Sequence, residues 1–184
     1  MSIAVKIIVL AVSLLISGFI WGFIRIRKRQ SDVNQHILSV QEGDIPALTD
    51  ECTSVFSEKF GINLDLDNLE SSAQILDESL LKSNQMNTMS AFERSGHTGW
   101  YVKPMGAFLG ELIRKNAHGR WIQAEGGGLA MIIGDEPNTI TLHPFDKINK
   151  QRWSGDPGDL FAYVITLKKG FAAIQATLPS SAEE

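Results

Sequence analysis

Residues 109–121 read LGELIRKNAHGRW, and this stretch decides how the chain is built. Before it, apolar residues recur every three or four positions, which is typical of a helix; after Gly119 they alternate, which is typical of a strand. Lys115 and His118 suit the negative end of a helix, and Trp121 opens the first strand. The stretch therefore indicates a helix-to-sheet junction inside an α+β domain.

We expect the helix before this junction to cover roughly residues 100–117. Gly106 and Gly110 are four positions apart and so stack on one of its faces. A glycine inside a helix costs about 1 kcal/mol relative to alanine, so two of them predict that another element packs closely there. Glu111 and Lys115 have the spacing of an ordinary i,i+4 ion pair.

Two further helices are predicted earlier in the chain. The first covers about residues 46–60, with apolar residues at helical spacing. The second covers about residues 67–80 and starts with Asp67 and Glu70, which have the spacing of a capping box. The polar segment 83–99, rich in Ser and Asn, predicts a flexible loop.

Downstream of the junction, short alternating runs and turn residues predict a three-stranded antiparallel sheet followed by one or two helices. The expected elements are strands at 120–125, 129–133 and 139–143, a hairpin turn at Gly126–Gly128, a short helix at 146–153, and a final helix at 160–169 capped by Asp159.

The start of the chain predicts a membrane anchor. Eighteen uncharged residues run from Ile7 to Ile24. As a helix they would cover about 27 Å, close to the roughly 30 Å of bilayer hydrocarbon, and the helix is expected over residues 3–24. The alternative is a cleaved signal peptide, but the run ends in Trp21 and Phe23 and not in small residues. We therefore expect a single-pass anchor.

Flanking charge predicts the orientation of this anchor. Arg25, Arg27, Lys28 and Arg29 follow it, whereas only Lys6 and the α-amino group precede it. The positive-inside rule then places the C-terminal domain in the cytoplasm and suggests a bacterial inner membrane. Within the anchor, the small residues Gly18 and Gly22 form a face that would allow a homodimer.

The predicted organisation follows from these segments. It comprises an anchor with its basic flank at 1–29, a juxtamembrane connector at 30–43, an α+β domain at 44–178 and a tail at 179–184.

Charge narrows the kinds of partner. From Gln30 onward 12 basic residues stand against 21 acidic ones, a net charge of −9. This argues against a phosphate-binding surface and hence against nucleic acid, whereas a basic protein partner is compatible with it. The lone cysteine, Cys52, excludes an internal disulfide framework and is expected to be a buried thiol.

No motif predicts a catalytic, metal or cofactor site. The four histidines are scattered, and the glycine run lacks the spacing that cradles phosphates. The neighbouring acids Asp77 and Glu78 are expected on an exposed helix face. An alternative remains open: a hydrolase whose site is assembled from scattered residues such as Glu111, His118 and His143.

A wider pattern links several of these features. Gly106 and Gly110 followed by Glu111, then Gly119-Arg-Trp121, then Pro144-Phe with Ile148 and Lys150, resembles a group of small bacterial α+β domains of unknown function. The resemblance covers about residues 60–165. It implies an architecture and no catalytic residues.

Together these features favour a membrane-anchored, non-enzymatic interaction module of a bacterial envelope system, such as an accessory or immunity-type protein. Partner contacts are commonly carried by exposed aromatic and arginine side chains. The candidates are Arg120 at the edge of the hairpin, and Arg152 with Trp153 at the end of the short helix.

Overall fold

A computed structural model describes residues 32, 34–35, 37–94, 101–154 and 156–177, although not the side chains of Lys82, 152–154 and 171–177. The predicted anchor with Gly18 and Gly22 lies outside these residues. The elements below belong to one compact unit, Ile37–Glu184.

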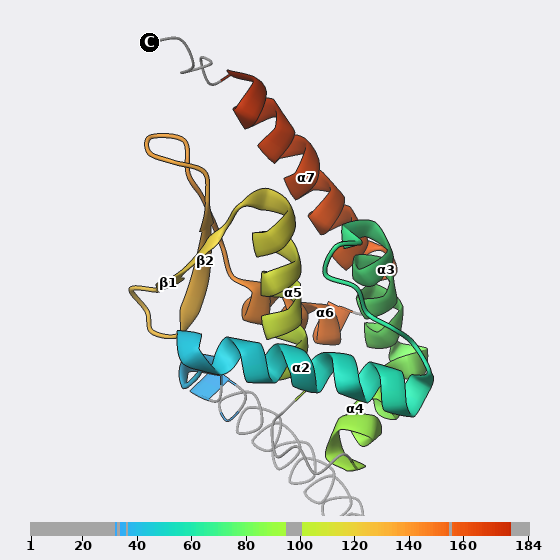
Figure 1. The fold of residues 1–184 in the computed structure, drawn as a ribbon. Helices are drawn as coiled ribbons and strands as arrows, with labels where there is room; N and C mark the ends of the chain where they lie inside the picture. The colour runs from blue at the N-terminus through green and yellow to red at the C-terminus, as the bar shows by residue number, and fades with distance from the viewer. Residues whose placement is uncertain (1–31, 33, 36, 95–100, 155, 178–184) are drawn as a thin grey trace, which may run out of the picture. The chain divides into compact units, whose positions relative to one another are not determined.

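The described part is an α+β domain with six α-helices and one three-stranded antiparallel sheet, which confirms the predicted fold class (Figure 1). Four α-helices precede the sheet where the sequence predicts three. The elements are η1 (Glu42–Asp44), α2 (Ile45–Val55), η2 (Phe56–Phe60), α3 (Leu69–Leu80), α4 (Lys82–Arg94), α5 (Val102–Ala117), β1 (Arg120–Gln123), β2 (Leu129–Ile133), β3 (Ile140–Leu142), α6 (Pro144–Ser154) and α7 (Asp159–Thr177).

Helix α5 is the centre of this unit. Most of its residues are buried, with Met105, Phe108, Leu109 and Leu112 at 0% exposure. It packs against α2, α3, α6 and α7 and against strand β2. In Figure 1 the hairpin lies on one side of α5 and α3 on the other. A helix surrounded by neighbours must be apolar over more than one face, as this one is.

The two glycines of α5 are points of close approach, as predicted. A Cβ atom at Gly106 would overlap the Phe145 ring of α6, and one at Gly110 would overlap the Trp121 indole of β1. These two rings also contact each other, with centroids 5.9 Å apart. The missing side chains of α5 thus make room for two large aromatic groups, which fix the sheet and α6 against the central helix.

The sheet forms as the alternating sequence predicts, with the order β1-β2-β3. Met131 in the middle strand pairs with Trp121 on one side and Leu142 on the other. Gly127 and Gly128 have φ of 86° and 76°, a region that favours glycine, so the glycine run makes the hairpin turn. Strand β1 ends two residues earlier than predicted.

The first predicted helix is present but changes character near its end. Helix α2 continues into η2, a π-helical turn. The helical conformation ends at Gly61, which has a φ of 67°. The Ile62 N–H donates to the Phe56 carbonyl at 3.1 Å and closes this turn. Cys52 has no exposed surface, and burial raises the pKa of its thiol well above the usual value.

The prediction of a flexible loop at 83–99 is wrong for its first part, because α4 occupies Lys82–Arg94. This helix buries Thr88, Ala91 and Phe92, which share one face. The Thr88 hydroxyl donates to the Ser79 carbonyl of α3 at 2.9 Å. Only two of these three side chains are apolar. The sequence of α4 therefore lacks the repeat of apolar residues that predicts a helix. Residues 95–100 lie outside the described part.

The predicted capping box at the start of α3 is also wrong. Asn68 is the N-cap, and its side-chain oxygen accepts the Ser71 N–H at 3.1 Å. The two acids of the supposed box form ion pairs with distant lysines instead: Asp67 with Lys115 at 2.6 Å, and Glu70 with Lys168 at 2.9 Å. Lys115 therefore does not pair with Glu111, contrary to the prediction.

The last two helices are longer than predicted. Helix α6 starts at Pro144, which is suited to a first helical position, and α7 runs from Asp159 to Thr177. None of the helices in the described ranges has the length and apolar character needed to cross a bilayer.

Candidate functional site

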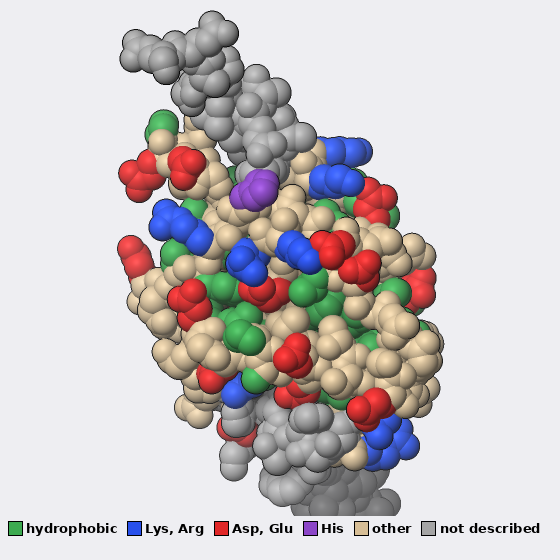
Figure 2. All heavy atoms as spheres, in the orientation of Figure 1, with side chains coloured by type: hydrophobic (Ala, Val, Ile, Leu, Met, Phe, Trp, Pro, Cys, Tyr) green, Lys and Arg blue, Asp and Glu red, His purple; other side chains and the backbone are tan. Residues whose placement is uncertain are grey.

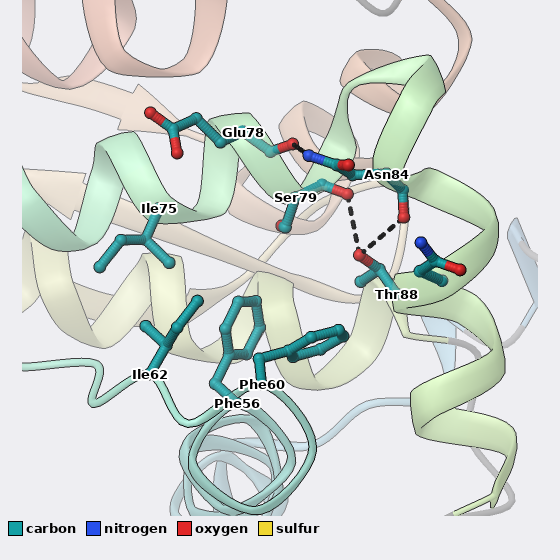
Figure 3. Close-up of a pocket in the computed structure, with 9 residues that line it drawn as sticks. Phe56, Phe60, Ile62, Ile75, Glu78, Ser79, Asn84 and Thr88 are labelled. Carbon is teal, nitrogen blue, oxygen red and sulfur yellow. Dashed lines mark hydrogen bonds between the residues drawn. The ribbon is translucent and has the colours of Figure 1, made fainter.

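A hollow with one apolar and one polar side opens between η2, α3 and α4 (Figure 3). Its volume is about 260 Å³. Its lining comes from three segments that are separated in the sequence: Phe56, Phe60 and Ile62 from η2 and the residues after it, Ile75, Glu78 and Ser79 from α3, and Asn84, Asn87 and Thr88 from α4.

The π-helical turn places two of these aromatic rings. Phe56 and Phe60 lie with their ring centroids 5.5 Å apart. Phe56 is buried and also contacts Phe92 of α4 edge-on at 6.5 Å, whereas Phe60 is only half-buried. Short π-helical turns are rare and frequently occur at functional sites. The turn thus supports one ring in the core and leaves the next one facing the hollow.

Two isoleucines complete the apolar part of the hollow. Figure 3 shows Ile62 and Ile75 pointing toward each other from opposite sides, next to the two rings. Ile75 is half-buried and Ile62 is 36% exposed. Apolar surface left in water is unfavourable by about 25 cal/mol per Å². A group that covered these side chains would therefore gain from their burial.

The opposite wall is polar, and two of its residues, Asn84 and Thr88, are hydrogen-bonded within the chain. The Thr88 hydroxyl contacts the carbonyls of Ser79 and Asn84, at 2.9 and 3.2 Å. The Asn84 amide donates to the Glu78 carbonyl at 3.1 Å. These are the dashed lines of Figure 3. An apolar group could therefore occupy the hollow without breaking these hydrogen bonds.

The residues of the alternative hydrolase site have different surroundings. The Glu111 carboxylate accepts from the Trp121 indole N–H at 2.8 Å and from the Arg114 guanidinium at 2.8–3.0 Å. Burial acts to raise the pKa of Glu111, but the bonds from Arg114 and Trp121 outweigh it and lower that pKa. Glu111 therefore stays ionised at neutral pH, which does not suit a general acid.

The two histidines of that alternative are both exposed. His118 is the C-cap residue of α5 and has a left-handed φ of 51°. His143 directly precedes α6. Neither lines the hollow described above. The hollow thus uses none of the residues that the hydrolase hypothesis names.

The predicted partner-binding residues lie elsewhere. Arg120 is exposed at the start of β1. Arg152 and Trp153 belong to α6, but their side chains lie outside the described part. Figure 2 shows basic side chains near the C-terminal end of α5, with acidic ones among them. Exposed Arg114 and Lys115 are on this end of the helix, each paired with an acid.

One acid is buried although its sequence context predicts an exposed position. Asp77 is 4% exposed and not on an open helix face, so the expectation for this residue is wrong. Its carboxylate accepts from the backbone N–H groups of Gly158 and Leu160 and from the Gln151 side chain. These contacts hold the start of α7 against α3, and they satisfy the acid within the fold.

No set of His, Cys, Asp and Glu residues in the described ranges could hold a metal ion. Comparison of the chain with protein-family models, curated proteins and solved structures gives no match. The resemblance to small bacterial α+β domains thus rests on the sequence pattern alone, and the candidate site rests on the geometry of the hollow.

Proposed function

We propose that this protein is a membrane-anchored, non-enzymatic interaction module of a bacterial envelope system, serving as an accessory or immunity-type protein. In this proposal residues 3–24 anchor the chain in the inner membrane, and the α+β domain faces the cytoplasm. The domain binds a protein partner through the hollow between η2, α3 and α4.

The observation that supports this proposal is the group of half-exposed apolar side chains around the hollow. Phe60, Ile62 and Ile75 face one space that the described residues of their own chain do not fill. Interfaces are commonly anchored by a few apolar groups inserted into such spaces, with a polar rim around them. Here the rim is supplied by Glu78, Asn84 and Asn87, all exposed.

The size of the hollow is compatible with insertion of a partner's side chain. Sites for small ligands usually enclose about 300–1,000 Å³. The hollow has about 260 Å³ and opens to solvent between the three segments. This volume lies just below that range, and the opening allows a side chain of a partner to enter.

The experiment compares two apolar-to-charged variants of the tagged full-length chain, produced in its source cells. Ile62→Asp places a charge in the hollow, whereas Leu38→Asp places one at a side chain that is 46% exposed outside it. Both variants and the wild type are purified from membranes, and co-purifying proteins are quantified. Circular dichroism of each chain checks that the fold is retained.

We expect a specific protein to co-purify with the wild type and with Leu38→Asp. The amount of this protein that co-purifies with Ile62→Asp should be at least tenfold lower. A wild type that retains no specific protein would contradict the interaction module. A partner that is retained equally by Ile62→Asp would contradict the hollow as the binding site.

A further inference from the structure

We propose that the hollow accepts one large apolar side chain from a partner segment that carries lysine or arginine directly beside it. This inference rests on the proposed function, because it names the chemistry of the partner at the same site. It commits to a basic partner and not to a second copy of this chain.

The apolar half of the hollow determines the inserted group. Phe60, Ile62 and Ile75 surround the space, and buried Phe56 forms its inner end. A branched or aromatic side chain could contact all of them at once, and its insertion would remove apolar surface from water. An alanine in its place would leave most of this surface in water.

The polar half limits how the partner's backbone can take part. The hydrogen bonds of Thr88 and Asn84 join α4 to the carbonyls of α3, so these groups already have partners. Helices α3 and α4 also use their backbone groups within themselves. Recognition by pairing of a partner strand is therefore disfavoured, and the inserted side chain has to carry the contact.

Charge determines what flanks that side chain. Glu78 is the charged residue among the described lining residues; its exposed carboxylate accepts from the Gln74 side-chain amide at 2.9 Å. On the neighbouring turn Glu58 and Lys59 balance each other, but the chain from Gln30 onward has a net charge of −9. A second copy would bring the same negative charge, whereas a basic segment is attracted from a distance. The geometry and the charge together favour a cationic apolar segment.

The test uses synthetic peptides and the full-length chain in a zwitterionic detergent, with ¹³C-labelled isoleucine δ1-methyl groups. The probe is Ac-Ala-Lys-Phe-Lys-Ala-amide. One matched control replaces Phe by Ala, and the other replaces both Lys by Glu. The methyl signals of Ile62 and Ile75 report on the hollow, and buried Ile133 of β2 serves as an internal reference.

We expect the probe to shift the signals of Ile62 and Ile75 saturably while Ile133 stays unchanged. Each control peptide should bind at least tenfold more weakly, and binding of the probe should weaken with added salt. In the variant Ile62→Ser, the probe concentration that half-saturates the shift of the Ile75 signal should be at least tenfold higher. Leu38→Ser, a matched change at an exposed side chain outside the hollow, should leave the affinity unchanged.

Three results would overturn the inference. Equal binding of the Lys and Glu peptides would remove the charge preference, and equal binding of the Phe and Ala peptides would remove the inserted side chain. Absence of saturable shifts with every peptide would also contradict it. If a partner still co-purifies with the wild type and not with Ile62→Asp, that third result leaves the proposed function standing.

Discussion

The carboxylate of Asp77 on α3 accepts the backbone N–H of Leu160, 83 residues later, at 3.1 Å. It also accepts the N–H of Gly158, so one side chain from a distant helix satisfies two donors at the start of α7. A helix start leaves its first N–H groups without partners inside the helix. Asp77 performs the capping role that the sequence predicts for Asp159, whose own carboxylate pairs with Lys147 at 2.7 Å.

Removal of this cap should destabilise the protein markedly. We expect Asp77→Ala to lower the free energy of unfolding by about 2–3 kcal/mol, because buried N–H groups lose a charged acceptor. The adjacent Glu78→Ala changes an exposed side chain and should cost about 0.5 kcal/mol or less. Equilibrium urea unfolding of the full-length chain measures both. Similar losses for the two variants would contradict a capping role for Asp77.

The same carboxylate should leave a signature in the pH dependence of stability. Burial raises the pKa of Asp77, although the hydrogen bonds from Leu160 and Gly158 and the charge of Lys147 oppose this. A raised pKa in the folded state means that the native protein binds the proton more tightly than the unfolded chain. This group therefore contributes more stability as the pH falls through its folded pKa toward the ordinary value of 3.8.

A comparison with Asp77→Asn isolates this effect, because the other titrating groups, including Glu111, are common to both chains. We expect the advantage of the wild type over Asp77→Asn to grow between pH 7 and pH 4 in urea unfolding. An advantage that shrinks on acidification would show that the folded pKa of Asp77 lies below its ordinary value.

Local patterns explain which parts of the fold could be predicted. Helix α5 and the hairpin were found because their apolar periods and turn glycines are local signals. Helix α4 was missed because its buried face includes polar Thr88 within a run of Asn and Ser. The cap from Asp77 could not be predicted, because capping rules compare residues about three positions apart and Asp77 lies 83 residues before Leu160. The hollow could not be predicted, since its lining joins three separate segments.

The glycines offer a test of the predicted close packing. Gly110→Ala should lower the free energy of unfolding by about 2 kcal/mol, because its methyl group would overlap the Trp121 indole. Gly170→Ala is the matched control, since it lies in α7 with open space around it. There the better helix propensity of alanine should stabilise the chain by about 0.5–1 kcal/mol. Changes of the same sign in both variants would argue against the close approach of α5 and β1.

The proposed membrane topology is tested with reporter fusions. Alkaline phosphatase is active outside the cytoplasm, and β-galactosidase is active inside it. With either reporter fused after Glu184, we expect strong β-galactosidase activity and little phosphatase activity, because the basic residues 25–29 follow the predicted anchor. Changing Arg25, Arg27, Lys28 and Arg29 to glutamine should weaken this preference. High phosphatase activity in the unaltered chain would place the domain on the other side.

The most direct test of the central claim is photo-crosslinking from inside the hollow. A photoreactive phenylalanine analogue replaces Phe60 in the full-length chain, and a second chain carries the analogue at Leu38, outside the hollow. Irradiation of intact source cells is followed by mass spectrometry of the adducts. The account predicts a defined protein adduct from position 60, absent from position 38, in which the crosslinked peptide carries lysine or arginine beside an apolar residue. Adducts from position 60 with lipid or with the chain itself, and none with another protein, would contradict it.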